Sequence, residues 1–133
     1  MRNTIEMLFG AGVKRGTALE WIKVGSSTAE GGYNTYYDPA TVRRTGDKVK
    51  MWHLHDFKGT QVSADKTYSS SKNWVEYDCA SAQRRTLYFS WNAKNMDAGE
   101  TVYRMDVPSE WRPVAPRSIA EMLMRVARET PVA

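Results

Sequence analysis

The feature that most constrains the fold is the alternation of side-chain character in two ten-residue segments, K-V-K-M-W-H-L-H-D-F (48–57) and R-R-T-L-Y-F-S-W-N-A (84–93). A period of two residues is typical of β-strands, because successive side chains point to opposite faces of a sheet. Five Trp, seven Tyr and three Phe are interleaved with polar residues along the chain. Aromatic rings favour half-buried pleated surfaces, so we expect most of them to serve as sheet core and cross-strand pairs.

Turn-forming residues divide the chain into about six strands. Gly31-Gly32, Asp38-Pro39 and Thr45-Gly46-Asp47 are turn signals, and the polar segment 58–66 is expected to be a loop. The expected strands span residues 19–25, 33–38, 48–57, 67–79, 84–93 and 101–105. Within 48–57, Trp52 and Leu54 share one face and Met51, His53 and His55 the other. The pattern leaves open which of these faces is turned inward.

A helix is predicted over residues 118–128. Ser118 and Glu121 have the spacing of a capping box, and Arg125 and Arg128 lie where cations suit the helix dipole. An apolar stripe is formed by Ile119, Met122, Leu123 and Val126. The predicted fold class is therefore α+β: a single antiparallel β-sheet of about six strands with one C-terminal α-helix packed on it.

Chain length and net charge limit the number of domains and the kinds of partner that we expect. With 133 residues the chain fits one domain, expected over 19–130 and preceded by a poorly ordered leader over 1–18. The leader is a poor secretory signal, because Glu6 precedes its short apolar run and two glycines interrupt it. No apolar run is long enough for a transmembrane helix. The net charge of +4 is spread along the chain, so nucleic acid is not an expected partner.

His53 and His55 form an H-x-H pair whose rings project from one strand face, roughly 6.5–7 Å apart at the backbone. Such a pair can chelate a metal only with a third ligand, and none is identifiable. We therefore expect two partly exposed strand histidines, with no metal and no cofactor. The alternative is a small-ligand or metal-binding protein that uses the aromatic sheet face and these histidines.

No catalytic constellation is recognisable. Cys79 has no signature segment around it and is expected to be a structural free thiol. Glu76 and Asp78 alternate onto one strand face, where carboxylates are usually solvated. The chain is predicted not to be an enzyme.

The order of segments resembles the bacterial surface-adhesin protein E family over about residues 19–128. The resemblance is carried by E-W-I-K-V-G, Y-Y-D-P-A-T-V-R-R-T-G-D-K-V-K-M-W-H-L-H-D-F-K, Y-S-S-S-K-N-W-V-E-Y-D-C, R-R-T-L-Y-F-S-W, G-E-T-V-Y and W-R-P-V-A-P-R-S. It implies a helix-backed antiparallel sheet without enzymatic activity. It also implies a protein of the periplasm, outer membrane or cell surface of Gram-negative bacteria, whereas a genuine written N-terminus would favour the cytoplasm.

The resemblance further implies protein partners, such as host-matrix or envelope proteins. Arg43, Arg44, Lys48 and Lys50 are candidate contributors to such binding, and an edge strand or Cys79 offers a route to a homodimer. Family members pair the cysteine of the Y-D-C segment with one at the end of the final helix. Cys79 matches the first cysteine, but Arg128 stands at about the position of the second. The disulfide between sheet and helix is therefore expected to be missing.

Overall fold

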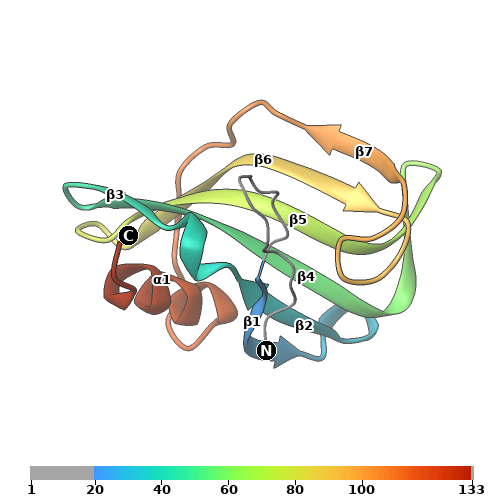
Figure 1. Ribbon diagram of the computed structural model, residues 1–133, viewed down its shortest axis with the longest axis horizontal. Helices are drawn as coiled ribbons and strands as arrows, with labels where there is room; N and C mark the ends of the chain where they lie inside the picture. The colour runs from blue at the N-terminus through green and yellow to red at the C-terminus, as the bar shows by residue number, and fades with distance from the viewer. Residues whose placement is uncertain (1–19, 133) are drawn as a thin grey trace, which may run out of the picture.

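The computed structural model describes residues 20–132 as one antiparallel sheet with a helix at its C-terminal end (Figure 1). The leader predicted over residues 1–18 lies outside the described residues. The strands are β1 (Ile22–Ser27), β2 (Tyr33–Tyr37), β3 (Arg43–Thr45), β4 (Lys48–Ser63), β5 (Lys66–Asp78), β6 (Gln83–Asn92), β7 (Thr101–Met105) and β8 (Arg112–Pro113). The helix α1 spans Ile119–Glu129, and short 3₁₀ turns span Ala29–Gly31 and Pro39–Thr41.

The main sheet runs in the order β1-β2-β4-β5-β6-β7, with β3 paired to β4 and β8 paired to β6. The predicted fold class is confirmed, since six strands form the main order and one helix follows them. The short strands β3 and β8 were not expected, because three-residue and two-residue strands leave too little alternation to recognise. No helix within residues 20–132 is long and apolar enough to span a membrane.

The polar segment 58–66 forms the tip of a long hairpin, so the prediction of a loop there was wrong. β4 continues to Ser63 and β5 begins at Lys66, leaving only Ala64 and Asp65 in the turn. Both turn residues have positive φ, 51° and 62°, as a two-residue hairpin turn requires. Ala-Asp is not one of the usual sequences for that turn, and the hairpin tip is too polar to show an apolar period.

The structure decides which face of β4 is turned inward. Val49 and Met51 are buried beside their β5 partners Tyr77 and Val75, under the helix residue Leu123. The face that carries His53 and His55 is therefore the one that α1 covers in part. The opposite face also has a buried residue, Leu54.

The helix turns a slightly different side to the sheet than the apolar stripe predicted. Leu123, Met124 and Ala127 are its buried residues, whereas Met122 is 38% exposed. Met122 and Ile119 instead lie over Gly25 of β1, where an added Cβ would come within 3.2 and 3.1 Å of their side-chain carbons. The absence of a side chain at Gly25 thus lets the start of α1 approach the edge of the sheet.

Candidate functional site

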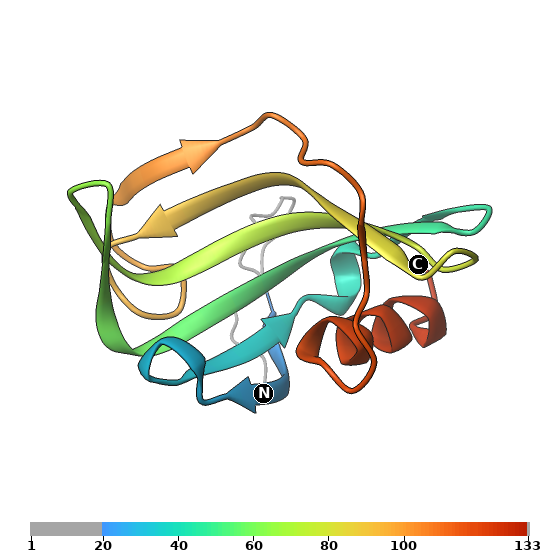
Figure 2. The ribbon, with the colours of Figure 1, turned by 180° about the vertical axis from the view of Figure 1, so that it is seen from behind.

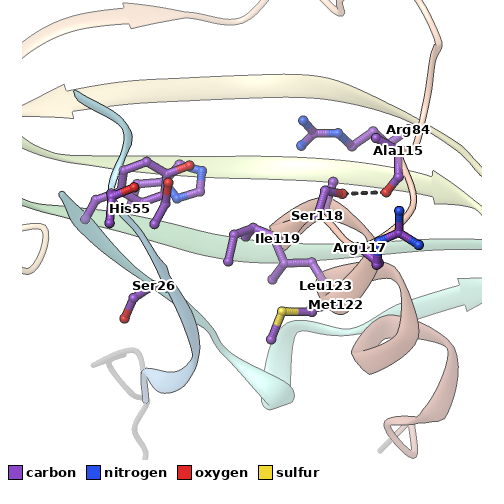
Figure 3. Close-up of a pocket in the computed structure, with 13 residues that line it drawn as sticks. Ser26, His55, Arg84, Ala115, Arg117, Ser118, Ile119, Met122 and Leu123 are labelled. Carbon is purple, nitrogen blue, oxygen red and sulfur yellow. Dashed lines mark hydrogen bonds between the residues drawn. The ribbon is translucent and has the colours of Figure 1, made fainter. Parts of the chain in front are cut away.

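The start of α1 and the end of β1 border an open cavity. Its volume is about 710 Å³. Ser26, Ser27 and Thr28 line one side, and Ser118 lies at the helix start. Figure 3 shows His55 on one side of the cavity and Arg84 and Ser118 on the other, with Ile119 between them.

The capping box builds the helix side of this cavity. The Ser118 hydroxyl accepts a hydrogen bond from the Glu121 amide at 3.1 Å, as the sequence predicted. The Glu121 carboxylate accepts one from the amide of Arg117, at 2.7 Å. Arg117 has a φ of 58°, so the chain turns sharply before the helix begins.

His53 and His55 lie side by side as the strand period predicted, with ring centroids 5.3 Å apart. The expectation that both are partly exposed was wrong for His53, which is 1% exposed and has no hydrogen-bond partner for either ring nitrogen. Burial, aided by His55 and Arg84, holds the pKa of His53 well below its usual value. His55 lines the cavity, its Nδ1 lies 2.9 Å from the Thr35 hydroxyl, and burial followed by Arg84 lowers its pKa to about 4.

Within residues 20–132 the histidine pair has no further metal ligands beside it. Residues 20–132 contain no group of three or more His, Cys, Asp or Glu side chains placed to hold a metal ion. Two neutral imidazoles, one of them fully buried, are better suited to packing than to holding an ion alone.

Six partly or fully buried rings form a continuous surface, here called the aromatic face, on the histidine side of β2 and β4–β7. Its members are Tyr33, Phe57, Tyr68, Phe89, Trp91 and Tyr103. Tyr68 stacks on Trp91 with centroids 4.4 Å apart and ring planes 10° apart. Tyr33 also contacts His55 at 4.9 Å, so the aromatic face begins at the cavity and ends at β7. Figures 1 and 2 show α1 at the other end of the sheet, near β3.

A second aromatic group lies on the opposite side of the sheet. Trp52 contacts Trp74 at 5.3 Å and Tyr88 at 5.7 Å, and the Lys72 ammonium lies 4.9 Å from the Trp52 ring centroid. Together these four side chains border a shallow space of about 380 Å³. The alternation along β4 and β6 therefore divides the sheet aromatics between two faces.

Three of the four candidate partner-binding cations are engaged within the chain. The Arg44 guanidinium donates hydrogen bonds to the carbonyls of Ala127, Arg128 and Thr130, at 2.9, 3.0 and 3.2 Å. Arg43 donates to two carbonyls of its own turn, and the Lys48 ammonium lies 3.7 Å from Asp78. Arg44 therefore has a structural role at the end of the helix, which no sequence signal indicated.

Cys79 is a free, half-buried thiol that packs against the core. Burial raises its pKa, partly offset by Arg128 and Arg44. Arg128 therefore lies near Cys79, as the family spacing implied. The hydrogen bonds from Arg44 to the last helical turn connect the helix to the sheet in the region where the family resemblance implies a disulfide that this chain lacks.

Glu76 is 6% exposed, so the expectation of a solvated carboxylate was wrong for this residue. Its Oε1 accepts a hydrogen bond from Arg85 Nε and is paired with Arg85 Nη2, both at 2.9 Å. The alternation of β5 and β6 places the two side chains opposite each other, and the pairing satisfies the buried charge.

Comparison with known proteins agrees with this architecture. The crystal structure of protein E from non-typeable Haemophilus influenzae superposes with a TM-score of 0.59 at 11% sequence identity, covering 100% of this chain and 92% of that one. At this identity the likeness shows the fold. A comparison with curated proteins gives no significant match. The family model described as surface-adhesin protein E matches residues 21–127, and the chain therefore belongs to the surface-adhesin protein E family.

Proposed function

We propose that this protein is a non-enzymatic component of the cell envelope or cell surface that acts by binding another protein, in the manner of an adhesin. The observation that carries the proposal is membership of the surface-adhesin family over most of the chain. Host-matrix and envelope proteins are the partners to examine first. The resemblance favours export to the periplasm, outer membrane or surface.

The edge strand β7 and the adjoining aromatic face form the binding surface that best fits this function. β7 is the last strand of the main order, so one of its edges is unpaired within the described residues. An open edge can accept a strand from a partner by β-augmentation. Met105 and Val107, at and just past the end of β7, are 36% and 66% exposed, and Tyr103 of the same strand belongs to the aromatic face. Exposed apolar side chains beside aromatic anchors are typical of protein interfaces.

The test is binding of the purified full chain to immobilised extracellular-matrix proteins and to envelope extracts of its own bacterium. Tyr103→Ser should weaken binding by about tenfold or more, because buried aromatic anchors carry much of the energy of an interface. Tyr88→Ser, on the other side of the sheet, is the matched control. Equal weakening by both variants, or no saturable binding to either source, would contradict a partner surface at β7.

The cellular location of the protein is tested by a separate experiment. Cell fractionation, combined with mass spectrometry of the mature N-terminus, should recover the protein from the periplasm, the outer membrane or the surface. An intact Met1 in the cytosol would overturn the envelope assignment.

The second candidate function is binding of a small ligand or a metal through the aromatic sheet face and the His53/His55 pair. The cavity of about 710 Å³ beside His55 and Tyr33 favours the small-ligand form, since its size is typical of ligand pockets. Stoichiometric zinc or copper binding that is lost in His53→Ala would support the metal form. Its absence would remove that form.

A further inference from the structure

The cavity between β1 and the start of α1 has an unbalanced charge. Arg84 and Arg117 are its charged lining residues, and no Asp or Glu of the described chain lines it. Neutral polar residues, Ser26, Ser27, Thr28 and Ser118, lie around them, although the hydroxyls of Ser26 and Ser118 already donate to Asn34 and to the carbonyl of Ala115. A hollow lined by cations and hydroxyls, without a carboxylate, has a positive potential that favours an anion.

Arg84 is the better placed of the two cations. It is half-buried on β6, and Figure 3 shows its side chain extending toward the side of the cavity where His55 lies. The ion pairs among the described residues join other side chains, including its neighbour Arg85, which is bound to Glu76. A guanidinium that faces a cavity without a carboxylate partner is suited to bidentate binding of an oxyanion.

The start of α1 adds to the same potential. Ile119 and Ala120 line the cavity with the first turn of an eleven-residue helix, whose amino end carries a partial positive charge. The one acidic residue of that turn, Glu121, is held by the Arg117 amide and does not line the cavity.

Most of the remaining lining is apolar. Ile119, Met122 and Leu123 form the helix side, and the Tyr33 ring continues into the aromatic face. A free inorganic ion would leave these side chains without contacts. An apolar molecule without charge would leave the two guanidinium groups unmatched.

We propose that this cavity binds a small organic carboxylate, with the carboxylate at Arg84 and Arg117 and an apolar body against Ile119, Met122 and Tyr33. This ligand chemistry deepens the second candidate function and is independent of protein binding at β7. Helix, sheet and preceding linker each contribute one part of the recognition: the apolar wall, the Arg84 guanidinium and the Arg117 guanidinium. No covalent step is involved.

The test is a two-dimensional amide NMR titration of the full chain with three probes: 4-phenylbutyrate, its uncharged amide 4-phenylbutyramide, and inorganic phosphate. The carboxylate should give saturable shifts at Ser27, His55, Ser118 and Ile119. The amide and inorganic phosphate should each bind at least tenfold more weakly, since one lacks the charge and the other the apolar body. Equal binding of acid and amide, shifts confined to other parts of the chain, or no saturation by the acid would each overturn the proposal.

Variants assign the roles of the cations. Arg84→Gln and Arg117→Gln should each weaken 4-phenylbutyrate binding by about tenfold, as expected for loss of one charge-assisted contact. Arg104→Gln, exposed on β7, is the matched control and should bind as the wild type does. If Arg84→Gln loses the dispersed spectrum of a folded chain, the exposed Arg117 carries the test alone. Unchanged affinity in Arg117→Gln would then overturn the proposal. Binding of matrix or envelope proteins is measured separately, so failure of one function does not hide the other.

Discussion

Lowering the pH from 7 to 5 should destabilise this protein through His53, which is buried, and His55, which is partly buried. In the folded chain the pKa of His55 is about 4, because burial, and then Arg84, disfavour the imidazolium. In the unfolded chain the pKa of the same group is 6.5. At pH 5 the unfolded state therefore binds a proton that the folded state does not, and stability must fall as the pH falls.

The size of the effect follows from the two pKa values of His55. Linkage predicts a loss of about 2 kcal/mol in the free energy of unfolding between pH 7 and pH 5, or about 1–2 kcal/mol after allowing for the partial exposure of the ring. The loss begins as the pH drops below 6.5 and is complete below pH 4. His53 adds to it in the same direction, since its pKa is also lowered by burial.

Urea unfolding followed by tryptophan fluorescence at pH 7, 6 and 5 measures the effect. His55→Gln keeps a hydrogen-bonding group near Thr35 but cannot titrate, so its stability should fall by about 1–2 kcal/mol less than that of the wild type over this range. The carboxylates contribute to both proteins alike and cancel in the difference. The same loss in wild type and His55→Gln would show that His55 keeps its ordinary pKa in the fold, and would refute the reasoning.

Three further predictions concern the helix and the thiol. Arg44→Gln should cost about 1–2 kcal/mol of stability in urea unfolding, because three carbonyls at the end of the helix lose a cationic donor. Arg43→Gln should cost less, since the hydrogen bonds of Arg43 stay within its own turn. Equal losses in the two variants would contradict the capping role of Arg44. Ser118→Ala should cost about 1 kcal/mol through loss of the N-cap, and an unchanged midpoint would contradict that cap. Cys79 should react with a disulfide reagent at pH 8 more slowly than a free model thiol, because burial raises its pKa, and an equal rate would show an accessible thiolate.

Much of the architecture was predictable from local pattern. The alternation along 48–57 and 84–93 specifies strands because only a period of two places Met51, His53 and His55 on one face. The spacing of Ser118 and Glu121 specified the helix start, which depends only on bonds within one turn. The order of these segments also carried the resemblance to the family, and the family model agrees with it.

What lies against each face was decided only by the tertiary structure. Period-two alternation is symmetrical, so it separates His53 from Trp52 without saying which side receives the helix. The cavity needs the linker to return the start of α1 to β1, where Gly25 permits close approach and Arg84 of a distant strand faces His55. Local propensity and spacing therefore determined the elements. The charge and shape of the candidate site arise from contacts between residues far apart in the chain, and no local pattern records those contacts.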